Sequence, residues 1–211
     1  MRLQLLAALA LFACAGCKEA LTQTAEYRPG EAGTVDRAMC LLGFAGVPLR
    51  ELVTGHHLVD VEINGRKATF VLDTGANRSV LHAGYAEQLG IGEGTAVPGA
   101  AIGLGGAMKA RQVGIERMQI GSVPIRQSRV MTADLSQLTN LLGPLSGDTI
   151  YGLIGQDVMK EHRAVIDVSR PILYLIEADE DPAPVSADRC REEPSGGGNT
   201  ATRDASGSSG T

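Results

Sequence analysis

Apolar and polar residues alternate over several short segments between residues 57 and 176, which is the period of β-strands. The clearest segment, His57–Ile63, is followed by Asn64-Gly65, a dipeptide typical of a two-residue hairpin, and then by a second β-rich run, Lys67–Leu72. Further short apolar segments lie at 79–81, 113–120, 123–131, 150–154, 164–168 and 172–176. Many short strands at close spacing predict a closed or sandwich β architecture.

Helical signals are few and short. Ala83–Leu89 has helical character and is followed by Gly90, a residue typical of helix ends. Asp134 can cap a second short helix that carries leucines at helical spacing. The fold class predicted is therefore mostly β, with one or two short helices.

The two ends of the chain differ from its middle. Arg2, the apolar run Leu3–Ala13 and the small residues after it resemble an export signal, with a run about half the length that spans a bilayer. The residues before Cys17 resemble a lipoprotein signal, while ordinary cleavage near Ala15 stays open. We expect residues 1–17 to be a signal peptide. We also expect the protein to be exported to the periplasm or cell envelope, with lipidated Cys17 as membrane anchor.

Composition divides the remaining chain into three parts. Residues 18–46 are expected to form a tether, in which the apolar stretch Met39–Val47 can dock on the domain that follows. Residues 179–211 are rich in acids, proline, serine and glycine, and cannot bury enough apolar surface to fold, so we predict a disordered tail. Residues 47–178 then form the folded domain.

Charge and cysteine content narrow the function classes. The net charge is −5, and no basic patch or stripe indicates a nucleic-acid-binding protein. Aromatic residues make up only 3% of the chain, so its core must be aliphatic. Of the four cysteines, Cys40 and Cys190 remain after the signal; in an oxidising compartment they can form a disulfide or stay as two thiols.

The segment that carries candidate chemistry is an apolar strand that runs directly into Asp73-Thr74-Gly75-Ala76. A carboxylate at the end of a buried strand must be hydrogen-bonded or paired. Thr74 offers a hydroxyl, and Gly75 allows the backbone to turn its amides toward the carboxylate. Such a turn holds an acid rigidly for general acid–base catalysis.

These motifs resemble the bacterial single-domain aspartyl proteases of the retropepsin-like group, over roughly residues 47–177. Asp73-Thr74-Gly75-Ala76 resembles the catalytic signature of the family, and Gly152–Met159 is similar to its second motif, an apolar pair and a glycine before a short helix. The glycine-rich stretch 101–106 falls where the family places a hairpin over the substrate. The resemblance implies a retropepsin-like acid-protease β-barrel, with a substrate-binding flap formed by Gly103, Leu104, Gly105 and Gly106.

The same resemblance implies a reaction and a stoichiometry. The family activates water with two aspartates that share one proton, because two close carboxylates cannot both ionise. This chain contains one Asp-Thr-Gly, since Asp148-Thr149 is followed by Ile150. We therefore expect a homodimeric aspartic endopeptidase in which each copy supplies Asp73. Thr74 would bond to the partner loop, and the Gly75 amide would donate to the carboxylates. The substrate is a polypeptide, and no cofactor is implied.

Other interpretations of these residues stay open. Asp73 can be a structural acid that caps a turn, and the fold can serve as a catalytically silent, peptide-binding module of the cell envelope. The stretch Gly103–Gly106 can be a flexible loop. We interpret Asp157 as an acid at a helix start. His56 and His57 do not indicate a metal site, because adjacent residues of a strand point to opposite faces.

Overall fold

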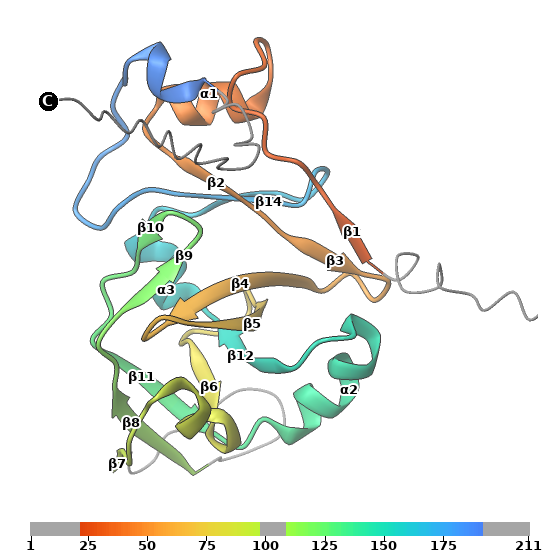
Figure 1. The fold of residues 1–211 in the computed structure, drawn as a ribbon, viewed down its shortest axis with the longest axis vertical. Helices are drawn as coiled ribbons and strands as arrows, with labels where there is room; N and C mark the ends of the chain where they lie inside the picture. Colours follow the sequence, from red (N-terminus) through yellow and green to blue (C-terminus); the bar gives the residue numbers. More distant parts are fainter. Residues whose placement is uncertain (1–21, 98–108, 192–211) are drawn as a thin grey trace, which may run out of the picture.

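The computed structural model describes residues 22–97 and 109–191, and the fold is mostly β with a few short helices, as predicted (Figure 1). Most strands belong to one large sheet in the order β1-β3-β4-β5-β12-β6-β11-β8-β7, with β9 pairing to β4 and to β10. The strands of this sheet are β1 (Thr22–Thr24), β3 (Arg50–Leu52), β4 (His57–Ile63), β5 (Arg66–Leu72), β6 (Val80–His82), β7 (Thr95–Val97), β8 (Ala110–Gly114), β9 (Met118–Ile120), β10 (Val123–Pro124), β11 (Arg129–Ala133) and β12 (Ile150–Ile154).

The hairpin of β4 and β5 has the predicted turn. Asn64 and Gly65 both have positive φ, of 52° and 79°, which is the backbone that a two-residue turn between right-twisted strands requires. The register places His57 opposite Leu72, so the start of β4 lies beside the end of β5. This hairpin therefore fixes where the chain leaves β5 and enters the Asp73 turn.

Strand β12 lies between β5 and β6. It runs parallel to β5, with Ile154 opposite Leu72, and antiparallel to β6, with Gly152 opposite Leu81. A Cβ atom at Gly152 would overlap the carbonyl oxygen of Val80, so this position requires glycine for the close approach of the two strands. The segment that joins β5 to β6, residues 73–79, must consequently pass the end of β12.

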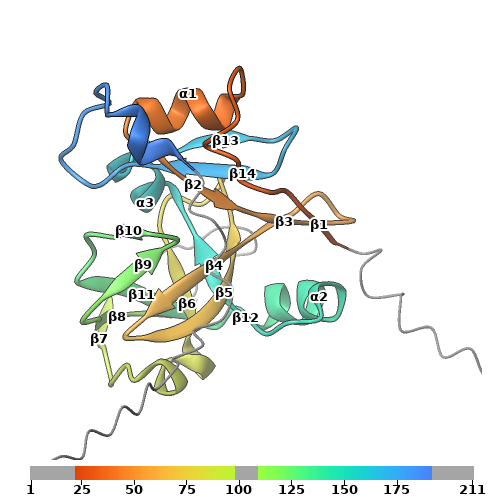
Figure 2. The same ribbon diagram turned by 45° about the horizontal axis from the view of Figure 1, so that its top comes forward.

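A second sheet has three strands in the order β13 (Val165–Asp167), β14 (Ile172–Leu175) and β2 (Ala45–Pro48). One of its faces packs with helix α3 (Gln156–Glu161) in the main core, through residues such as Leu173 and Met159. The other face packs against helix α1 (Val35–Leu41) through Tyr174 and Met39. Figure 2 shows α1 and the short helix η4 (Ala187–Cys190) above this sheet, with α3 below it.

The range predicted as a tether, 18–46, contains folded elements where the structure describes it. Residues 22–46 include β1, α1 and the start of β2. In the apolar stretch Met39–Val47, Met39 and Phe44 pack with the second sheet, and residues 45–47 belong to its strand β2. A disulfide joins Cys40 to Cys190 across 150 residues of sequence, and so selects one of the two states that the sequence left open. The tail from residue 179 is followed as far as Arg191. The division of the chain into domains stays a prediction.

The two predicted helices take different forms. Ala83–Leu89 forms two successive 3₁₀ turns, η2 (Ala83–Tyr85) and η3 (Glu87–Leu89), which end at Gly90 with φ 68°. Gly84 lowers the helix propensity of this short segment, which favours isolated turns. Helix α2 (Ser136–Ser146) begins after Asp134, whose carboxylate accepts hydrogen bonds from Ser136. Within the described ranges, no helix is long and apolar enough to span a membrane.

Candidate active site

Asp73 lies directly after β5, in a turn stabilised by its own backbone. Its amide donates to the carbonyl of Ile154 at 2.9 Å, and its carbonyl accepts from the amide of Ala76 at 3.2 Å. The Gly75 amide donates to Oδ1 of Asp73 at 2.9 Å. The Asp73 side chain stays partly exposed to solvent. Asp73 is thus a fixed carboxylate that water can reach.

Thr74, Gly75 and Ala76 complete this turn. Thr74 and Gly75 are exposed, and Ala76 packs partly against the core cluster that includes Val71 and Leu153. The carbonyl of Thr74 accepts a hydrogen bond from Nε2 of Gln156 at 2.7 Å. The hydroxyl of Thr74 has no hydrogen-bond partner in the part of the chain that the structure describes. Within the described residues, the Thr74 hydroxyl is therefore available to a further partner.

The start of α3 holds the other side of the turn. The amide of Gln156 donates to the carbonyl of Ala76 at 2.8 Å. A Cβ atom at Gly155 would lie 2.6 Å from the carbonyl carbon and oxygen of Arg78, so only glycine permits the contact. The two motifs that the sequence places about eighty residues apart thus lie directly against each other.

A partly buried hydrogen-bond network joins Ser79 to Asp157. The Asp157 carboxylate accepts from the Ser79 hydroxyl at 2.7 Å, from the Ser79 amide at 2.9 and 3.0 Å, and from the Val158 amide at 2.9 Å. The Ser79 hydroxyl in turn accepts from the Gly155 amide at 2.9 Å. Asp157 therefore acts as a structural acid at a helix start. The sequence showed this acid but gave no signal for its bond to Ser79, because the two residues are 78 positions apart.

A groove of about 510 Å³ opens beside the turn. Thr74 and Gln156 line one end, and Met159, Lys160, Arg163, Ala164 and Ile166 line the rest. Arg163 is held by an ion pair with Asp181 and by the carbonyl of Glu180. Lys160 is exposed and has no acidic partner among the described residues. The lining therefore combines apolar side chains with Lys160, whose charge is not balanced by an ion pair among the described residues.

Among the described residues of the two motifs, no second carboxylate of the same chain lies beside Asp73. Asp157 is bound to Ser79, and Asp148 forms an ion pair with Arg50, which also contacts Asp60. The described residues contain no group of three His, Cys, Asp or Glu side chains that could hold a metal ion. The Asp73 turn thus offers one carboxylate per chain.

The other residues considered from the sequence lie as follows. The predicted flap residues Gly103, Leu104, Gly105 and Gly106 fall outside the described residues. The Nδ1 atom of His56 bonds to the Thr54 hydroxyl at 2.9 Å. Nε2 of His57 is buried without a partner among the residues described, and Nδ1 of His82 accepts from the Leu135 amide at 3.0 Å. His56 and His82 are thus bound within the protein.

Comparison with known proteins shows which family the sequence around this site resembles. Residues 59–158 match the family described as aspartyl protease. A search of the curated proteins finds no match. Similar solved structures include a retropepsin-like aspartic protease from Rickettsia conorii, with 19% identity, coverage of 63% of this chain and 91% of that one, and a TM-score of 0.43.

Two further structures show similar values. The EIAV protease complexed with the inhibitor HBY-793 has 21% identity, covers 51% of this chain and 88% of its own, and has a TM-score of 0.40. The retroviral protease-like domain of Ddi1 from Leishmania major has 17% identity, covers 62% and 94%, and has a TM-score of 0.40. The family match spans Asp73 and the start of α3, and it confirms the predicted resemblance of this chain to the retropepsin-like aspartyl proteases.

Proposed function

We propose that this protein is an aspartic endopeptidase that hydrolyses peptide bonds through water activated by two Asp73 carboxylates, one from each of two copies. The observation that carries the proposal is the Asp73 turn. It holds a partly exposed carboxylate against the Gly75 amide and lies inside the stretch that matches the aspartyl protease family. Asp73 is the proposed catalytic residue, and Thr74, Gly75 and Ala76 support it.

The chemistry follows from two carboxylates that share one proton. The ionised Asp73 accepts a proton from the water, whose oxygen attacks the scissile carbonyl carbon. The protonated Asp73 donates a hydrogen bond to the carbonyl oxygen, which develops negative charge. Transfer of a proton to the amide nitrogen then allows the C–N bond to break, releasing a carboxyl group and an amine.

Two features support the contribution of a second copy. The chain has one Asp-Thr-Gly, and Asp148 is held by Arg50. In addition, the hydroxyl of Thr74 lacks a partner among the described residues, as a group that bonds across an interface would in a single copy. A twofold axis beside Thr74 would bring two such turns together.

The disulfide supports an exported protein. Disulfides such as Cys40–Cys190 persist in oxidising compartments, including the periplasm. We therefore propose that residues 1–17 direct export, that Cys17 carries a lipid anchor, and that the protease acts on polypeptides in the cell envelope.

The experiment is cleavage of an unbiased peptide library by the purified full chain, from about pH 4 to about pH 7. The full chain is used because the disulfide links residues on both sides of the family match. Asp73→Asn keeps the shape of the side chain but cannot ionise, so cleavage should disappear. At low protein concentration, the rate should rise with the square of the concentration.

Either of two results would contradict the proposal. Cleavage that persists in Asp73→Asn would place the reaction elsewhere. Peptide binding without cleavage by a folded dimer would favour the silent peptide-binding module.

A further inference from the structure

The β3–β4 turn holds an exposed apolar side chain at its tip. Val53 is 61% exposed, and the turn around it is closed by the Gly55 amide, which donates to the carbonyl of Leu52 at 2.8 Å. A single exposed valine is ordinary on a protein surface. Its meaning therefore depends on what lies beside it.

Helix α2 lies beside this turn. Leu52, next to Val53, belongs to the same buried core cluster as Leu142 of α2. Arg50 of β3 forms an ion pair with Asp148, which follows α2. Figures 1 and 2 show the turn and the helix on the same side of the molecule. The two elements are therefore neighbouring parts of one surface.

The exposed face of α2 carries no charge. None of the 11 residues of the helix is charged, although charged residues make up 20% of the chain. Leu141 is 63% exposed, and the other exposed residues of the helix are Gln137, Asn140 and Pro144. Surface helices usually place charged residues on the side that faces solvent. An uncharged face with an exposed leucine is better suited to an apolar phase than to water.

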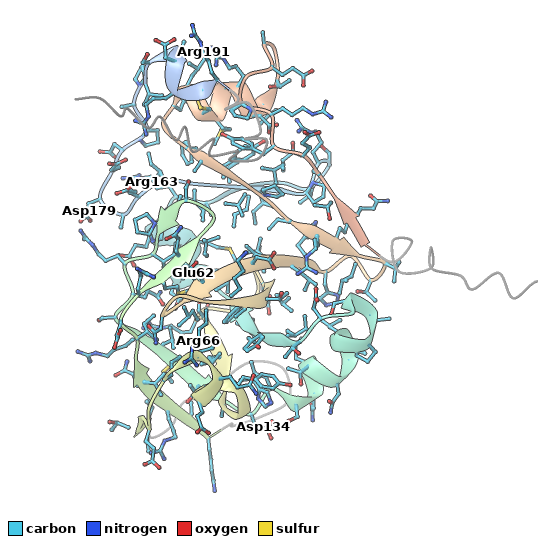
Figure 3. The ribbon with its side chains drawn as sticks, in the orientation of Figure 1. Glu62, Arg66, Asp134, Arg163, Asp179 and Arg191 are labelled. Carbon is cyan, nitrogen blue, oxygen red and sulfur yellow. A yellow bond between two sulfur atoms is a disulfide. The ribbon has the colours of Figure 1, made fainter. Side chains whose placement is uncertain are left out.

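Unpaired charge does not oppose such a contact here as it would elsewhere. Arg50 of β3 binds both Asp60 and Asp148, so the charges that join the strands to the end of α2 are paired. Arg163 and Asp179 also belong to ion pairs, and Figure 3 shows both on the other side of the molecule from α2. Moving charged groups from water toward lipid costs free energy, so the side with α2 can meet a bilayer more readily.

The chain enters the described structure at this same place. Thr22, the first described residue, is the partner of Leu52 in the register of β1 and β3. Residues 18–21 separate it from Cys17, the proposed site of the lipid anchor. Five peptide units span at most about 18 Å when fully extended. A lipid on Cys17 would therefore keep Thr22 within about 18 Å of the bilayer, with the β3–β4 turn beside it.

We infer that the β3–β4 turn and the exposed face of α2 dock on the lipid bilayer, with Val53 and Leu141 entering the layer between head groups and acyl chains. The inference rests on the lipid anchor that belongs to the proposed function. Stable attachment generally needs a second contribution besides one acyl chain, and the apolar contact supplies it. The domain then lies against the membrane, because Thr22 is already part of a strand and leaves only a short connection to Cys17.

Tryptophan fluorescence of the lipid-anchored full chain tests the inference, because the sequence contains no Trp. Val53→Trp and Leu141→Trp each place one Trp on the proposed surface. Leu42→Trp is the matched control: Leu42 is 41% exposed at the end of α1, which Figures 1 and 2 show above the second sheet and away from α2. All three positions are exposed, so the fold should tolerate the changes.

The variants are bound to phosphatidylcholine vesicles whose acyl chains carry bromine, which quenches Trp on contact. Fluorescence should be lost in Val53→Trp and Leu141→Trp, where the indole reaches the interface, and kept in Leu42→Trp. Equal quenching of the three variants, or no quenching in either Val53→Trp or Leu141→Trp, would overturn the inference.

Hydrogen exchange of the unaltered chain on the same vesicles does not depend on how a variant folds. Residues 53 and 54 are exposed, as are residues 92 and 93, and none of these four amides donates a hydrogen bond in the described structure. Relative to the rates of an unfolded chain, the amides of 53 and 54 should exchange about tenfold or more slower than those of 92 and 93. Equal protection of the two pairs would contradict the docking.

The lipid, the docking and the protease function fail in different ways. The intact mass of the chain shows whether Cys17 carries a lipid, and Asp73-dependent cleavage of a soluble peptide is measured on the same vesicles. Quenching at positions 53 and 141 without cleavage keeps the docking and removes the protease function, and cleavage without quenching does the reverse. A chain that has no lipid on Cys17 and does not bind vesicles removes both the anchor and the docking.

Discussion

Two regions of this molecule are held in place by different means. The Asp73 turn is fixed by backbone hydrogen bonds to Ile154 and Gln156, by glycine at a close contact, and by the Ser79–Asp157 network. The layer formed by α1 and η4 on the second sheet is fixed by a disulfide and by a buried carboxylate, Asp36.

Asp36 shows how the layer is built. Its carboxylate is fully buried and accepts hydrogen bonds from the Tyr174 hydroxyl at 2.5 Å, from the Arg28 amide at 2.8 Å and from Arg170 at 2.8 Å. Burial by itself would raise the pKa of Asp36, but these hydrogen bonds and the charge of Arg170 outweigh it, so the pKa lies below its usual value. The layer thus depends on one covalent link and one buried charged cluster, whereas the turn depends on several backbone hydrogen bonds and a close glycine contact.

Removal of the disulfide, which holds the α1–η4 layer, should lower the free energy of unfolding more than any other change considered below. Replacing both Cys40 and Cys190 by serine frees a loop of 150 residues in the unfolded chain, and the chain-entropy estimate gives a loss of up to about 5 kcal/mol in the free energy of unfolding. Urea denaturation of the double variant and of the wild type measures this loss.

The same variant separates the two regions functionally. Where the double variant is still folded, its activity per molecule should stay within about twofold of the wild type, because no bond of the Asp73 turn involves the disulfide. A large loss of activity in a folded double variant would show that the layer positions the turn, and the contrast between the regions would then be wrong.

Ser79→Ala should lower the free energy of unfolding less than removal of the disulfide does. Unlike that change, it should also lower the rate of peptide cleavage. The change removes the hydroxyl that Asp157 and the Gly155 amide share, and leaves a buried amide unpaired, which costs about 1–3 kcal/mol. Because this hydroxyl connects α3 to the turn, peptide cleavage should fall together with thermal stability.

Ser136→Ala is the matched control for that variant. Its hydroxyl bonds only to the exposed Asp134 at the start of α2 in the described structure, so its effect should be within about 0.5 kcal/mol. Equal effects of the two substitutions on unfolding would show that the Ser79 network contributes nothing specific.

The features predicted correctly from the sequence depend on neighbouring residues or belong to a short sequence motif. The β4–β5 hairpin follows from Asn64-Gly65, whose two residues suffice to set the turn. The Asp73 turn and the start of α3 could be placed because each has its own short motif. Residues 22–46 were assigned to a tether because their composition is polar, and Asp36 gave no sign of burial. Its partners Arg170 and Tyr174 lie 134 and 138 positions away, and only the folded chain brings them together.

The pH dependence of stability should show the smallest effect, and it isolates Asp36. Since the pKa of Asp36 is lower in the folded than in the unfolded chain, its ionised form stabilises the fold above the unfolded pKa, near 3.9. That contribution is lost as the pH falls through the folded pKa.

Asp36→Asn removes the ionisation, so the difference in free energy of unfolding between wild type and variant should shrink below about pH 4. Asp134→Asn is the control: the pKa of Asp134 is also lowered, by hydrogen bonds from Ser136, but its carboxylate is exposed, and its contact with a distant segment, the Nδ1 atom of His82, is long at 4.0 Å. Its difference from wild type should stay small at every pH. A difference for Asp36→Asn that is constant with pH would mean that Asp36 acts in the layer through its shape and hydrogen bonds, and not through its charge.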